Sequence, residues 1–181
     1  GGPKALAGTT GQEEEVALAR GSAIHLLLEH LAKEEPSERA ERAKALLRNF
    51  PETDTVLTEA ERVLDAPHLR ALFAPNTFCE VEVSAPLPDW EGRVMQGVID
   101  RLVVSDDHVL AVDFKSNTQV PSSAQAVPEG ILRQMGAYAA ILEQIYPGRR
   151  VELAIVWTAT TEFMPIPLNI VRAAMQNATL P

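Results

Sequence analysis

The segment GVIDRLVVSDDHVLAVDFKS, residues 97–116, places ionisable side chains inside two apolar strands, and this restricts what the chain can fold into. Asp100 lies in the first Val- and Ile-rich run, whereas Asp113 and Lys115 lie in the second. The polar residues SDD between the runs are typical of the tight turn of an antiparallel hairpin. An ionised carboxylate without a partner is costly to bury, so the hairpin needs a cation close to its acidic groups.

Two explanations of these charges are open at this point. Lys115 could form an ion pair with one aspartate, which is the ordinary arrangement for one acid beside one lysine. Two acids and one lysine leave a net negative charge, however, and a divalent metal ion could neutralise it. Residues i and i+2 of a strand share a face, so Asp113 and Lys115 point the same way, and an antiparallel neighbour can bring Asp100 opposite them.

Carboxylate oxygens from two strands are suitable ligands for Mg²⁺, which prefers oxygen and commonly uses one or two carboxylates. A neighbouring lysine could then orient an attacking water or stabilise the charge that develops on a phosphate group. The pattern of acids and lysine therefore predicts the site of a phosphodiesterase.

Hydrophobic periodicity along the chain predicts an α/β (α+β) fold with a helical N-terminal region, flanking helices and a mixed central sheet that contains a three-strand antiparallel meander. A capping box at residues 10–13 would open the first helix. We expect helices at residues 13–35, 36–50, 58–66, 128–148 and 169–178, and strands at residues 77–87, 93–104, 108–116, 151–159 and 161–168.

Length and composition favour a single globular domain spanning residues 1–181, because 181 residues with 46% hydrophobic side chains can bury a substantial core. Its expected parts are a disordered or tag-derived leader at 1–10, a helical part at 11–75, the sheet with its long helix at 76–168, and a terminal helix at 169–181. No apolar run or leader of the secretory type is seen, so we expect a cytoplasmic protein without membrane contact.

Charge and cysteine content exclude two classes of protein. The net charge of −9 argues against a free-standing nucleic-acid binder, because Lys and Arg usually supply most of the affinity for phosphates. If the substrate is a nucleic acid, another domain or a partner is expected to hold it. The single Cys79 excludes an internal disulfide framework and any cysteine-rich zinc or iron–sulfur site.

The ordered motifs of this chain resemble those of the PD-(D/E)xK nucleases, and specifically their RecB-like branch. Asp100 in GVID matches the first aspartate of the family, and Asp113-Phe114-Lys115 matches its (D/E)xK element. Three matches lie outside the hairpin: His25 in GSAIHLLLEH, Glu80 in CEVEV, and the QxxxY pair of Gln134 and Tyr138. The resemblance implies a restriction-endonuclease-like core.

The same resemblance implies roles for these residues. It makes Asp100, Asp113, Lys115 and Glu80 catalytic, although Glu82 shares a strand face with Glu80 and either could be a solvent-facing charge. The implied ligands of Mg²⁺ or Mn²⁺, as one ion or two, are His25, Asp100, Asp113 and the backbone carbonyl of Phe114. The implied DNA-binding or supporting residues are Gln134, Tyr138 and Arg101, of which Arg101 could instead pair with a nearby acid.

Within the branch, the helix-first layout is similar to the C-terminal nuclease domain of AddA-type helicase–nucleases. This implies a fragment of a longer protein that cuts DNA as exonuclease or endonuclease during double-strand-break repair and recombination. The implied partners are DNA, the helicase domains of the same protein and an AddB-type subunit. The chain contains no Walker A sequence, so we expect no ATP site in it.

Three other hypotheses compete with this one. The chain could be an inactive DNA-holding or structural module that keeps the nuclease fold, but none of the expected acids or the lysine is missing. It could be a stand-alone RecB-like nuclease, although the group of this kind that carries an iron–sulfur cluster needs more cysteines than Cys79. It could also be an unrelated domain with a coincidental hairpin, in which His25, Asp100 and Asp113 would not converge.

Overall fold

The computed structural model describes residues 11–178 and divides the chain into two compact units. The first, here called the helical unit, contains the described chain up to Pro75 together with Phe114–Val120 and Trp157–Glu162. The second, here called the sheet unit, contains Asn76–Asp113, Pro121–Val156 and the described chain from Phe163 onward. The leader and the capping box predicted at the N-terminus lie at or reach outside the described residues, and the domain boundaries stay a prediction.

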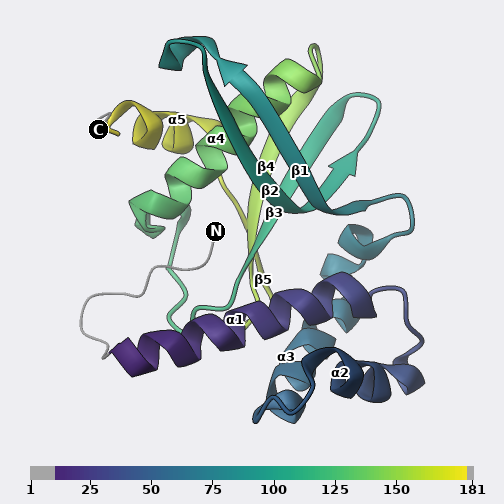
Figure 1. Ribbon diagram of the computed structural model, residues 1–181. Helices are drawn as coiled ribbons and strands as arrows, with labels where there is room; N and C mark the ends of the chain where they lie inside the picture. The colour runs from purple at the N-terminus through teal and green to yellow at the C-terminus, as the bar shows by residue number, and fades with distance from the viewer. Residues whose placement is uncertain (1–10, 179–181) are drawn as a thin grey trace. The chain divides into compact units, whose positions relative to one another are not determined.

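The helical unit is built on α1 (Gly11–Leu31), α2 (Arg39–Leu47) and α3 (Thr53–Asp65), which pack against one another (Figure 1). Short 3₁₀ turns, η1 (Pro36–Glu38) and η2 (Pro67–Phe73), connect and follow them. Apolar residues at helical spacing form the buried faces, as expected for amphipathic helices. On α1 these residues are Ile24, Leu27, Leu28 and Leu31, and on α3 they are Val56, Ala60 and Val63.

The third helix begins at Thr53, five residues before the start that we expected from the sequence. Pro51 ends the preceding segment, and the Thr53 hydroxyl donates a hydrogen bond of 2.7 Å to the carbonyl of Phe50 at the entry of the helix. Val56 and Leu57 are both buried, so the apolar stripe extends one turn further upstream than the sequence alone indicated. Tertiary burial therefore set this boundary.

Five strands follow one another in the order β1-β2-β3-β4-β5. They are β1 (Phe78–Leu87), β2 (Arg93–Val104), β3 (His108–Lys115), β4 (Arg150–Trp157) and β5 (Glu162–Pro165). The first three pair antiparallel, which confirms the predicted meander. Hydrogen bonds from Arg150 to Asp107 and from Thr158 to Lys115 advance in the same direction along both strands, so β4 runs parallel to β3 and the sheet is mixed.

Two helices pack within the sheet unit. The helix α4 (Glu129–Ile145) lies along β1 and β2, and α5 (Leu168–Gln176) packs against α4 (Figure 1). β4 is buried along almost its whole length, as expected for a central strand that is covered on both faces. None of the helices in the described part of the chain is both long and apolar enough to cross a bilayer.

Candidate functional site

Two acidic residues of the sheet unit stand opposite each other on β1 and β2. Cys79 pairs with Arg101 and Val81 pairs with Ile99, so Glu80 lies across from Asp100 in the ladder. A carboxylate oxygen of Glu80 lies within 4.8 Å of one of Asp100. Like charges directly opposite on neighbouring strands destabilise a sheet, so this pairing has to be explained by something other than folding stability.

A third carboxylate continues the same row on β3. The ladder between β2 and β3 pairs Arg101 with Val112, and one step beyond this pair lie Asp100 on one strand and Asp113 on the other. Asp100 is 9% exposed and Asp113 only 3% exposed. Three acidic side chains from three adjacent strands thus form one row, here called the carboxylate row (Glu80, Asp100 and Asp113), and burial weakens the screening of their mutual repulsion.

The backbone at Glu80 is strained. Its φ is +49°, in the left-handed region that residues with a Cβ rarely adopt. Such a conformation costs on the order of 1 kcal/mol, and it persists where the surrounding structure imposes it, often at functional sites. Glu82, the alternative acid on the same strand face, is exposed and has no such backbone. Strain and the proximity to Asp100 both distinguish Glu80 from its neighbour.

Gln134 and Tyr138, the predicted QxxxY pair, connect α4 to the strand that carries Asp100. The Gln134 amide donates a hydrogen bond of 2.9 Å to the Tyr138 hydroxyl, and that hydroxyl donates one of 2.7 Å to the carbonyl of Val98. Tyr138 is 3% exposed. Its position two residues before Asp100 fits a supporting role, since the phenol restrains the backbone of β2 next to the carboxylate row.

Gly97 allows this close approach between helix and strand. A Cβ added at Gly97 would lie 2.7 Å from a ring carbon of Tyr138, and the ring cannot withdraw because it is buried and its hydroxyl is bound to Val98. We therefore expect Gly97→Ala to lower the free energy of unfolding by about 1–3 kcal/mol, the usual effect of overpacking, as measured by urea denaturation. Gly130→Ala, in α4 with open space around it, is the matched control and should be neutral or stabilising. Equal stability of the two variants would contradict the tight contact.

The same tyrosine should make stability depend on alkaline pH. Burial, with the negative charges of Asp113 and Asp100, raises the pKa of the Tyr138 phenol above its ordinary value of 10. The unfolded chain then releases this proton at a lower pH than the folded protein. The contribution is therefore complete below pH 10 and is lost as the pH rises further. Between pH 9 and pH 11, the unfolding free energy of wild type should fall more steeply than that of Tyr138→Phe; parallel curves would contradict this.

The helical unit brings together two of the other predicted metal ligands. The His25 Nε2 lies 2.9 Å from the Phe114 carbonyl oxygen, and because a carbonyl can only accept, the imidazole N–H is the donor. The Phe114 ring stacks on Phe73 with 6.0 Å between centroids and meets the His25 ring edge-on, which fixes the strand end beside the histidine. Lys115 follows directly and is 5% exposed.

The structure thus places the predicted residues in two groups. In the sheet unit, Glu80, Asp100 and Asp113 form a row, with Tyr138 and Gln134 behind β2. In the helical unit, His25 contacts the Phe114 carbonyl and Lys115 is the next residue. Arg101 is 4% exposed, and its role stays a prediction. Sequence reasoning missed Arg20, Glu59 and Thr158, which hold the backbone around Lys115.

The chemistry of these donors fits a hard divalent cation. Carboxylate and carbonyl oxygens are the ligands that Mg²⁺ and Mn²⁺ prefer, and an imidazole nitrogen shifts the preference toward Mn²⁺. A cation also answers the electrostatic problem of the carboxylate row, because it replaces repulsion between neighbouring strands by attraction to one ion. The residues of the two groups could therefore hold such a metal.

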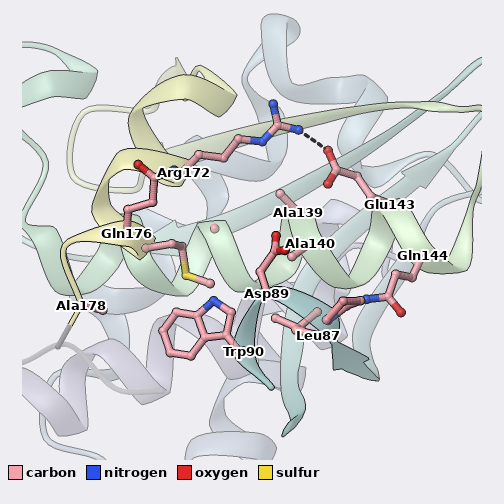
Figure 2. Close-up of a pocket in the computed structure, with 13 residues that line it drawn as sticks. Leu87, Asp89, Trp90, Ala139, Ala140, Glu143, Gln144, Arg172, Gln176 and Ala178 are labelled. Carbon is pink, nitrogen blue, oxygen red and sulfur yellow. Dashed lines mark hydrogen bonds and ion pairs between the residues drawn. The ribbon is translucent and has the colours of Figure 1, made fainter. Parts of the chain in front are cut away.

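The sheet unit also contains a hollow of about 610 Å³ that none of the predicted site residues lines. It lies between the end of β1, the 3₁₀ turn η3 (Pro88–Trp90), α4 and α5. Figure 2 shows the Trp90 ring at one side of it and the ion pair of Arg172 with Glu143, 2.5 Å long, at another. This charge is already paired, and we assign no chemistry to the hollow.

Comparison with known proteins agrees with the motifs. The sequence profile of the PD-(D/E)XK nuclease superfamily matches residues 4–173. An ATP-dependent helicase/nuclease subunit from Desulforamulus reducens is 29% identical over 148 residues, which are 70% of this chain and 12% of that protein. Its counterpart from Oenococcus oeni is 23% identical over 175 residues, which are 85% of this chain and 14% of that protein.

The chain therefore spans about one eighth of the length of the curated relatives that it matches. Among solved structures, "Crystal structure of SSO0001" covers 87% of this chain and 76% of its own, with 14% identity and a TM-score of 0.37. The sheet order and the profile match, rather than this similarity, define the fold.

Proposed function

This chain belongs to the PD-(D/E)XK nuclease superfamily, and on that premise we propose that it hydrolyses phosphodiester bonds of DNA with the help of a bound Mg²⁺ or Mn²⁺. The observation that carries this proposal is the carboxylate row. Three acidic groups on adjacent strands, two of them at most 9% exposed, are an unfavourable arrangement unless a cation binds there.

We assign the metal to Asp100 and Asp113 of the sheet unit, completed by His25 and the Phe114 carbonyl, as the family resemblance implies. Asp113 and Phe114 are consecutive residues of β3, so the covalent chain itself joins the two groups of ligands. Glu80 is the additional acid of the site. The metal, when bound, supplies a water of lowered pKa and neutralises negative charge on the scissile phosphate.

Lys115 is assigned to the nucleophile. Its ammonium group has three donors and no acceptor, so it can orient a water oxygen or stabilise the charge that develops on a phosphate oxygen. Its low exposure supports this role, because a lysine is rarely buried unless a charged partner or a function holds it there. Tyr138 and Gln134 support the strand with Asp100, and Arg101 lies beside that aspartate.

The acidic balance of the chain supports a division of labour. With 16 basic and 25 acidic side chains, the chain is a poor competitor for the DNA backbone on its own. We propose that it is the nuclease domain of a longer AddA-type helicase–nuclease that acts in double-strand-break repair and recombination together with an AddB-type subunit. Helicase domains of the same polypeptide would then deliver the DNA, and we place the protein in the cytoplasm.

The test combines metal binding with cleavage. The 181-residue chain is titrated with Mn²⁺ in a calorimeter, and single- and double-stranded DNA are incubated with it in Mg²⁺, Mn²⁺ or chelator. We expect metal-dependent cleavage that the chelator stops, and Mn²⁺ binding that Asp100→Ala abolishes. Mn²⁺ binding without cleavage would favour the DNA-holding module instead. Neither binding nor cleavage would overturn the proposal.

A further inference from the structure

The backbone on both sides of Lys115 is held by three hydrogen bonds, all inside the helical unit. Three consecutive carbonyls, those of Phe114, Lys115 and Ser116, accept from His25, Thr158 and Arg20 respectively. His25 belongs to the predicted metal site, but Thr158 and Arg20 have no role in it so far. The strand end that presents Lys115 is thus fixed at each successive peptide.

Thr158, which directly follows β4 and is fully buried, contributes two of the contacts. Its backbone N–H donates to the Lys115 carbonyl at 2.9 Å. Its hydroxyl lies 2.6 Å from the Glu59 Oε1 and 3.3 Å from the same Lys115 carbonyl. The hydroxyl has only one proton, so the shorter bond to the charged acceptor takes it. Thr158 therefore connects the backbone of Lys115 to the carboxylate of Glu59.

Glu59 is a buried acid on α3 whose two oxygens are both engaged. Oε1 accepts from Thr158, and Oε2 forms an ion pair with the guanidinium of Arg20 on α1. Its side chain is only 8% exposed, and the pair with Arg20 leaves no net charge at this point. An acid of this kind orients its partners, because each oxygen accepts from a group on a different element.

Arg20 extends the set to the residue after Lys115. A second guanidinium nitrogen donates to the Ser116 carbonyl at 3.5 Å, the longest bond of the set. α1 comes this close because the next residue is Gly21, where a Cβ would lie 2.9 Å from the Ser116 hydroxyl oxygen. Arg20, Glu59 and Thr158, here called the Lys115 clamp, thus join α1, α3 and the end of β4 at one strand end.

We propose that the Lys115 clamp is a set of positioning residues for the cleavage reaction, an inference that rests on the proposed function. The direction of a strand side chain follows from the orientation of the peptides on either side of it. Fixing the Lys115 and Ser116 carbonyls therefore fixes where the ammonium group points. Small displacements of a positioned group are costly in catalysis, so loosening the clamp lowers turnover while substrate affinity stays the same.

Thr158→Val is the primary test, because valine has nearly the same shape and keeps the backbone N–H but loses the hydroxyl. We expect kcat for Mn²⁺-dependent DNA cleavage to fall about tenfold with KM unchanged, and Thr158→Ser to restore it. Thr58→Val is the matched control, since that hydroxyl donates only to the Asp54 carbonyl on the exposed side of α3 and its loss should leave kcat unchanged.

Arg20→Lys keeps the test decisive if the valine variant folds poorly. Lysine keeps the positive charge beside Glu59 but lacks the fork that also reaches Ser116. We expect a lower kcat with a melting temperature close to that of wild type. Arg39→Lys is its control, because Arg39 is an equally buried arginine that pairs with Asp65 on the same helix, at 2.8 Å, away from Lys115.

The outcomes separate this inference from the proposed function. Active wild type with unchanged kcat in both Thr158→Val and Arg20→Lys would overturn the clamp and leave the nuclease proposal intact. A loss of activity that Thr158→Ser does not restore, or that the control variants share, would reduce the clamp to an ordinary structural role. Absence of metal-dependent cleavage by wild type would overturn both.

Discussion

Replacing Asp113 by asparagine should reduce metal-dependent DNA cleavage by about a hundredfold or more while the protein stays folded. Asp113 is 3% exposed and lies in the carboxylate row beside Asp100 and directly before the Phe114 carbonyl. Asparagine keeps the shape but removes the charge that attracts the metal. The loss should be measured as kcat/KM in Mn²⁺, with circular dichroism to establish that the fold is kept.

The control for this prediction lies in the same hairpin. Asp107 is a fully exposed aspartate in the turn between β2 and β3, where a hydrogen bond from His108 lowers its carboxyl pKa. Asp107→Asn removes the same charge from the same hairpin but not from the row. It should cut DNA at the wild-type rate. Cleavage by the Asp113 variant at that rate would remove Asp113 from the mechanism.

The second large effect is expected on thermal stability and needs no DNA. Glu80 lies across from Asp100 on neighbouring strands, so the metal-free protein contains a repulsion that a bound cation relieves. With Mn²⁺ at about a hundred times its dissociation constant, binding to the folded state adds about 2.7 kcal/mol. For a chain of this length that raises the melting temperature by about 5–10 °C. Chelator should reverse the rise.

Two variants decide whether the carboxylate row causes that rise. Asp100→Asn should lose most of the response to Mn²⁺ and, because the repulsion is gone, should melt no lower than wild type without metal. Glu82→Gln removes an exposed acid two residues beyond Glu80 on the same strand and should respond like wild type. A full Mn²⁺ response in Asp100→Asn would place the metal elsewhere on the chain.

The strands and most of the acidic ligands could be predicted because their signals are local. The runs around Asp100 and Asp113 are rich in Val and Ile and are joined by a polar turn, so the chain itself specifies two paired strands. An acid within such a run is visible without any knowledge of tertiary contacts. The order of the motifs then identified the family, which the profile match supports independently.

Glu59 illustrates what the same approach misses. It lies in the stretch ETDTVLTEAER, which the sequence presents as a solvated acidic helix face, yet it is buried and paired. Its spacing of three from Val56 and four from Val63 places it on the apolar side of α3, a signal that was present but weak. Its partner Thr158 is 99 residues away, and a lone threonine after a strand has no signal at all.

The sequence by itself determined the elements, the family and the identity of the charged groups, because periodicity and turn chemistry act between residues a few positions apart. Only the tertiary structure decided that Glu80 rather than Glu82 faces Asp100, that Tyr138 reaches the Val98 carbonyl, and that Arg20 and Thr158 hold the peptides around Lys115. These facts depend on ladder register and on which distant groups meet in the core. A shift of one residue in register would turn each of these side chains to the other face of the sheet, and no local pattern records that choice.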